Sequence, residues 1–189
     1  MNHIISGFAP PSGGQSPDTS GLPGFAGAVL PAITRPNDIP KFVELGICTT
    51  VQKYLSLLTG AGYRIGEGAM AIAHRVAVSP RRVGVRLITV PAGELGIVNG
   101  LAPYEEICER GAVNGLRLCP AELGFILRGC YREAGMGSIA LAMQTITGKD
   151  GLRRAFFFEF SRDGRWLRAS HIRPERLYTS RHRFIFALP

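Results

Sequence analysis

The apolar residues of this chain change their spacing along it, from a period of about 3.6 residues to a period of 2. From Val51 to Leu58 they recur at every third or fourth position, which predicts an amphipathic helix. Thr49 and Thr50 are its candidate N-caps, and it ends near Gly60. From residue 139 onward, apolar residues alternate with small or polar ones, as β-strands require. This order of helices and then strands predicts an α+β fold.

Three further helices are expected before the alternating region. An apolar stripe from Ile65 to Val76 predicts a second helix that pairs with the first. Pro103 and Pro120 each suit the first position of a helix, because proline has a fixed φ and its missing N–H group has no partner there anyway. The apolar faces of these two helices hold Tyr104, Ile107, Cys108 and Gly111, and then Leu123, Ile126, Leu127 and Cys130.

A strand is expected over residues 82–90, between the helical pair and the next two helices. Four more strands form the last third, and they cover residues 139–143, 153–160, 166–170 and 183–188. Asp-Gly pairs at 150–151 and 163–164 separate the middle strands, and this pair is preferred in tight hairpin turns. We expect an antiparallel four-stranded meander packed on the helices.

Composition divides the chain into three parts. Residues 1–40 are rich in Pro, Gly and Ser, which predicts a disordered leader, with a targeting or export leader as the alternative. Residues 41–80 hold the helical pair, and residues 81–189 form the α+β domain. The start of the chain lacks the features of a signal peptide, and no stretch approaches the ~20 apolar residues of a membrane span. We expect a cytoplasmic protein or, alternatively, one exported by a non-classical leader.

Positive charge is concentrated near the C-terminus. The chain has 22 basic and 14 acidic residues, a net charge of +8, and nineteen of the basic residues are arginine. Guanidinium groups bind phosphate and carboxylate and stack on aromatic rings, which are interleaved with these arginines. The alternative explanation is a codon bias toward arginine in a GC-rich genome. The candidate anion-binding residues are Arg153, Arg154, Arg162, Arg165, Arg168, Arg173, Arg176 and Arg181.

The four cysteines do not have the spacing of a metal site, and no histidine completes one. A chain of this length with no signal peptide is expected to keep them reduced. The glycine-rich runs at 60–62 and 66–68 lack the Gly-Lys-Ser/Thr of a phosphate-binding loop. We expect neither a metal nor a cofactor.

Cys119 is the candidate nucleophile. With Pro120 as the first helical residue, Cys119 becomes the N-cap, where the helix dipole lowers a thiol pKa. His171 or His182 would complete a Cys–His pair if the fold brought one of them near. In the alternative interpretation, Glu122 at the third helical position makes the same run a helix-start signal similar to a capping box.

The run from Gly115 to Gly124 contains the sequence Leu-Cys-Pro-Ala-Glu, and the runs Asp163–Leu167 and Arg183–Phe186 follow it. With these motifs, roughly the last 105 residues resemble a domain of uncharacterised bacterial proteins. The resemblance implies a shared fold and a bacterial origin, with no activity attached. Such relatives tend to have an acidic, aromatic loop where this chain has the arginine-rich residues 173–181, so a property that depends on that loop would be specific to this protein.

These patterns favour a non-enzymatic binding module that contacts an anionic partner through an arginine-rich C-terminal sheet and its loops. The expected partner is nucleic acid or an acidic protein. The alternative is an exported, effector-type bacterial protein, with or without a cysteine-based activity at Cys119.

Overall fold

The structure of the chain, a computed structural model, describes residues 39–97, 100–131, 138–159 and 164–189. The leader expected over residues 1–40 lies outside this range except for its last two residues. The elements, in chain order, are β1 (Phe42–Leu45), α1 (Val51–Gly60), β2 (Arg64–Ile65), α2 (Glu67–Ala73), β3 (Val83–Pro91), the 3₁₀ helix η1 (Ala92–Leu95), β4 (Leu101–Pro103), α3 (Tyr104–Val113), α4 (Leu123–Cys130), β5 (Ile139–Leu141), β6 (Ile146–Thr147), β7 (Arg153–Phe158), β8 (Trp166–His171), β9 (Leu177–Thr179) and β10 (Arg183–Ala187).

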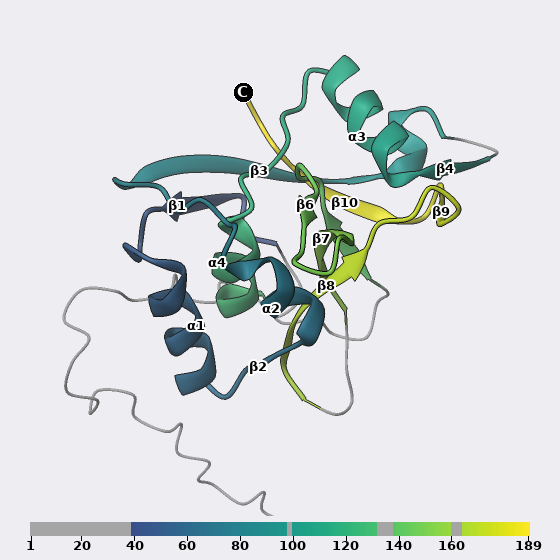
Figure 1. Ribbon diagram of the computed structural model, residues 1–189. Coiled ribbons are helices and arrows are strands. Elements are labelled where there is room, and N and C mark those ends of the chain that lie inside the picture. The colour runs from purple at the N-terminus through teal and green to yellow at the C-terminus, as the bar shows by residue number, and fades with distance from the viewer. Residues whose placement is uncertain (1–38, 98–99, 132–137, 160–163) are drawn as a thin grey trace, which may run out of the picture.

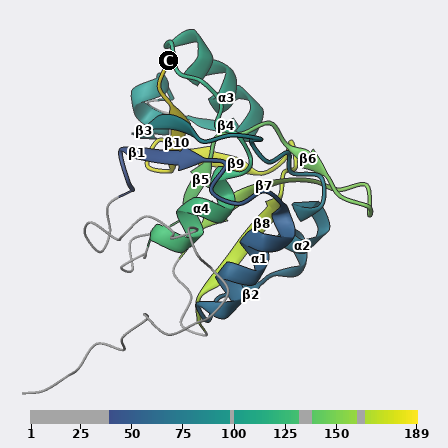
Figure 2. The same cartoon turned by 90° about the vertical axis from the view of Figure 1, so that its left-hand side faces the viewer.

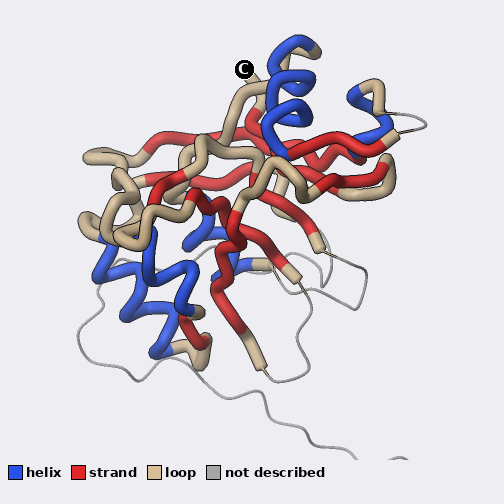
Figure 3. Tube along the Cα trace, turned by 45° about the vertical axis from the view of Figure 1, so that its right-hand side comes forward, coloured by secondary structure: helices blue, strands red, loops and turns tan. Residues whose placement is uncertain are grey.

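A mixed eight-stranded sheet runs through the middle of the molecule, in the order β1-β3-β10-β5-β7-β8-β2, with β6 paired to β7 (Figure 1). Helices α1, α2 and α4 gather on one side of this sheet, whereas α3 and the small β4–β9 sheet lie on the other (Figures 2 and 3). The α+β prediction is therefore confirmed.

Local signals located several helices. The side chain of Thr50 caps α1 by accepting a hydrogen bond from the main-chain N–H of Lys53 at 3.3 Å, and the helix ends at Gly60 as predicted. Helix α3 follows Pro103 directly. The apolar faces predicted for α3 and α4 are buried.

The last strand departs from a simple meander. β5, β7 and β8 pair antiparallel in the predicted order, but β10 pairs antiparallel with β3 and parallel with β5. Phe184, Ile185 and Phe186 are all fully buried, so both faces of β10 need cover. Pairing with β3 and β5 places β10 in the middle of the sheet, where the elements packed on the two sides of the sheet cover both of its faces.

Residues 41–80 differ from the expected helical pair. They contribute β1 and β2 to the two ends of the large sheet. Helix α1 packs mainly on α4, and α2 packs on β8 and β7. The predicted second helix is shorter than its apolar stripe, because Arg64 and Ile65 pair with β8 as a strand instead.

Helix α4 lies close against the sheet because it carries a glycine at the contact. A Cβ at Gly124 would overlap the ring of Phe156 in β7. Next to it, the rings of Phe125 and Phe156 meet edge to face, with centroids 5.5 Å apart. This contact anchors the helical side of the core.

A buried carboxylate ties α4 to three segments far away in the sequence. Glu122 is fully buried just before α4. Its Oε1 accepts hydrogen bonds from the Tyr54 hydroxyl at 2.6 Å and the Gly46 N–H at 2.8 Å, and its Oε2 accepts one from the Ser79 N–H at 2.8 Å. Three donors offset the cost of removing this group from water. The bonds of Glu122 therefore reach distant segments, rather than the start of its own helix as in a capping box.

The backbone conformation of Gly46 and the protonation of Tyr54 both suit the donation of a hydrogen bond to Glu122. Gly46 has a φ of 68°, and a Cβ there would overlap the main-chain oxygen of Arg81, so only glycine can present its N–H at this place. Burial and the hydrogen bond to Glu122 raise the pKa of Tyr54 well above its usual value. The tyrosine therefore keeps the proton that it donates.

We expect Glu122→Ala to lower the free energy of unfolding by on the order of 3 kcal/mol, because it leaves two partly buried N–H groups and a buried hydroxyl without an acceptor. Tyr54→Phe removes one donor and leaves the carboxylate with two, so it should cost only about 1 kcal/mol. Urea unfolding followed by circular dichroism measures both values. An Ala variant within 0.5 kcal/mol of the unmodified chain would contradict this role.

Candidate anion-binding surface

The alternation of side chains along β7 and β8 sorts the predicted arginines onto two faces of the sheet. Arg168 pairs with Phe157, so it lies on the face of Phe157, and Trp166, two positions before it on β8, shares that face. Arg154 pairs with His171, and both lie on the opposite face, which is covered by α4.

On the first of these faces, guanidinium groups and aromatic rings form a row across the strands. Arg64 pairs in register with Trp166, and its guanidinium carbon lies 5.4 Å from the centroid of the indole. The guanidinium carbon of Arg168 lies 4.9 Å from the same ring. The guanidinium carbon of Arg176 lies 5.3 Å from the centroid of the Phe157 ring, and Phe157 is the residue that pairs with Arg168. We call these five residues the arginine–aromatic row.

The row carries more positive than negative charge. Arg168 forms an ion pair with Glu159, with 3.4 Å between its Nε and the carboxylate. Arg64 and Arg176 are exposed, and in the part of the chain that the structure describes neither has an acidic partner. Contact with an aromatic face holds each of them at the surface and orients its planar group. The row can therefore offer oriented cations to an anion from solution.

A hollow of about 640 Å³ adjoins the row at the C-terminal end of β8. It is lined by Ser170, His171, Arg173, Glu175 and Arg176. Three of the residues predicted as functional, His171, Arg173 and Arg176, thus meet here. The two guanidinium groups and the hydroxyl of Ser170 are suitable donors for a phosphate, while Glu175 opposes an anion at one side.

The structure places the other predicted arginines away from the row. Arg154 is buried and forms a two-nitrogen ion pair with Asp150, with 2.7 Å between Nη1 and Oδ1. This pair holds the pKa of Asp150 well below its usual range. Arg153 bonds to Glu105 at 2.7 Å. Both cations already have partners within the protein, so their predicted role in anion binding is not supported by their surroundings.

Three further arginines complete the predicted set. Arg165 lies just before β8, with its guanidinium carbon 5.7 Å from the centroid of the Tyr63 ring. Arg181 is exposed in the turn between β9 and β10. Arg162 lies outside the described residues.

Arg64 was not predicted. It lies 89 residues before Arg153, the first of the predicted arginines, and nothing in its local sequence signals a basic site. The parallel pairing of β2 with β8 brings it to Trp166. Such a pairing joins segments that are distant in the sequence, and local spacing does not reveal it.

The predicted position of Cys119 at a helix N-cap is wrong. Helix α4 begins at Leu123, and Cys119 instead forms a β-bridge with Met143 and donates its thiol to the Ile185 carbonyl at 3.4 Å. Burial raises the pKa of Cys119 well above its ordinary value, which is the opposite of the predicted shift. The environment therefore favours the neutral thiol and disfavours a nucleophilic thiolate.

The two predicted histidines are not brought to this thiol by any hydrogen bond. His182 accepts a hydrogen bond at Nδ1 from the Thr179 N–H at 2.9 Å, and its ring meets that of Tyr178 edge to face. It stabilises the turn between β9 and β10. His171 lines the hollow near the arginines. Within the described residues, the hydrogen-bond partners of Cys119 are the main-chain groups of Ala142 and Ile185.

Comparison with protein-family models, curated proteins and solved structures found no match. No helix in the described ranges has both the length and the apolar character needed to span a membrane.

We expect iodoacetamide to alkylate Cys119 at pH 8 on the order of 100-fold more slowly in the folded protein than in the urea-unfolded chain, because reaction requires both opening of the fold and loss of the thiol proton. Peptide mapping by mass spectrometry gives the rate at each cysteine. Cys108, whose pKa burial raises to about 12, should be protected in the same way. Reaction of folded Cys119 faster than a model thiol would restore the hypothesis of a reactive cysteine.

Proposed function

We propose that this protein binds single-stranded nucleic acid across the arginine–aromatic row. The observation that carries the proposal is the arrangement of three guanidinium groups against the rings of Trp166 and Phe157 on one sheet face, with Arg64 and Arg168 on adjoining strands and Arg176 just before β9. Guanidinium groups neutralise phosphates, and guanidinium planes and the half-buried ring of Trp166 can stack on bases. The ring of Phe157 is buried and serves to orient Arg176.

A single strand fits this surface better than a duplex. Trp166 is half-buried and Arg64 is exposed, so part of the row is accessible from solvent. Bases must be unstacked and turned toward the protein to lie on such a surface, and single strands allow this at low cost. The hollow beside Ser170 gives a phosphate a second set of donors at one end of the row.

An acidic protein would use the same positive charge but has less need of the aromatic rings. Carboxylates on a partner are satisfied by cations alone, whereas stacking requires flat groups. Trp166 is the only tryptophan of the chain, so its fluorescence reports directly on the row. The two kinds of partner can be distinguished by this signal.

Titration with a twelve-residue oligouridylate should quench the fluorescence of Trp166, because a base that stacks on or beside the indole alters its surroundings. The affinity should fall as salt rises. A duplex of the same length and poly-glutamate of the same charge are the controls. Equal binding of the duplex, or binding of poly-glutamate with the same quenching, would contradict the proposal and favour a general polyanion or an acidic protein.

The double variant Arg64→Ser/Arg176→Ser should weaken binding of the oligouridylate and reduce the slope of log K against log salt by about 1.4, since each phosphate contact on a single strand contributes about 0.7. The matched control is Arg81→Ser/Arg117→Ser, which removes two exposed arginines near the β1–β3 and β10 end of the structure. A control variant that loses as much affinity and slope would show that net charge, and not the row, governs binding.

A further inference from the structure

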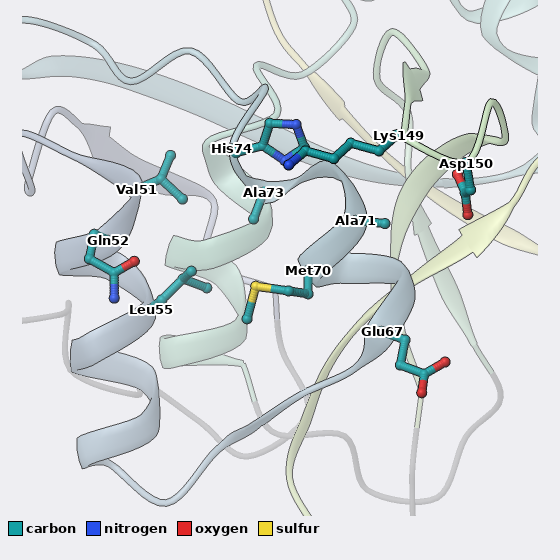
Figure 4. Close-up of a pocket in the computed structure, with 10 residues that line it drawn as sticks. All are labelled: Val51, Gln52, Leu55, Glu67, Met70, Ala71, Ala73, His74, Lys149 and Asp150. Atoms are coloured by element: carbon teal, nitrogen blue, oxygen red, sulfur yellow. The ribbon is translucent and has the colours of Figure 1, made fainter.

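An open groove of about 750 Å³ lies between α1 and α2, on the helical side of the molecule and outside the arginine–aromatic row (Figure 4). The groove forms because the two helices pack on different elements of the fold. Helix α1 packs on α4, whereas α2 packs on β8 and β7. The turn between β6 and β7 closes one side, where a Cβ at Gly148 would already touch the methyl group of Ala71 in α2.

The floor of the groove is apolar. Val51 and Leu55 come from α1, and Met70 and Ala73 come from α2. Met70 is 51% exposed and extends across the groove toward Leu55 (Figure 4). An exposed methionine is unbranched and adaptable, and it fits apolar groups of different shapes. The volume and apolar lining are those of a site for a small molecule.

The charges at the rim are not evenly distributed. His74 and Lys149 project toward the same end of the groove, while Glu67 lies near the start of α2 and points away from the floor (Figure 4). Asp150 also lines the groove, but its carboxylate is engaged by two nitrogens of Arg154. Lys149 is exposed and has no ion pair with any described residue. The end of the groove at His74 and Lys149 is therefore complementary to an anion.

We propose that this groove binds a small amphipathic carboxylate, such as a medium-chain fatty acid. The hydrocarbon chain lies on Leu55 and Met70, where its burial is favourable. The carboxylate accepts hydrogen bonds from Lys149 and His74 at the rim. This site is independent of nucleic-acid binding by the row.

The test uses the full-length chain with methionine methyl groups labelled by carbon-13 and titrated with decanoate. The methyl signal of Met70 should shift on binding, while that of Met143, which is buried elsewhere in the core, should not. Decanol and decyltrimethylammonium, which have the same chain, should bind at least tenfold more weakly, because neither presents an anion to Lys149.

Lys149→Gln should weaken decanoate binding about tenfold, the effect of losing one charge-assisted hydrogen bond. Lys41→Gln makes the same chemical change next to β1 and should leave the affinity unchanged. Equal affinity for decanoate and decanol would overturn the proposal, as would a Met70 signal that does not move at millimolar decanoate. An unchanged affinity in Lys149→Gln would also overturn it.

Discussion

The fold depends on a carboxylate that is fully removed from water. Glu122 accepts hydrogen bonds from Gly46 after β1, from Tyr54 in α1 and from Ser79 before β3, so one side chain fixes three segments around the start of α4. An unpaired charge at such a place would be strongly destabilising, and the three donors share the task of offsetting that cost. The turn at Gly46 and the protonated state of Tyr54 both follow from this requirement.

The position of α4 determines what the two sides of the sheet can do. With α4 held against Phe156, the helical side is filled by apolar contacts, and α1 and α2 rest on different neighbours with a groove between them. On the other side, α3 and the β4–β9 sheet cover only part of the surface, and β8 and β2 remain accessible there. Arg64 and Trp166 of the row lie on this accessible part.

Clustering of arginine in the sequence did not by itself define a site. Arg153 and Arg154 are neighbours in the chain, yet each is engaged by an acidic group of the protein. Arg165 and Arg168 are three positions apart, yet Arg165 lies against Tyr63 and Arg168 lies against Trp166. The strand register decides which arginines act together, and it also recruits Arg64 from a distant segment.

Local structure followed from short-range patterns in the residues: the Thr50 cap, the start of α3 after Pro103, the apolar faces of α3 and α4, and the approximate strand positions. These features depend on residues within a few positions of one another, where spacing and capping preferences act directly. Three features became visible in the folded protein alone: β10 lies between β3 and β5, Cys119 is buried, and Arg64 pairs in register with Trp166. Each of these features depends on contacts between segments far apart in the chain. Local spacing allows several strand pairings equally well, and the need to bury both faces of β10 and to give the Glu122 carboxylate its donors selects among them.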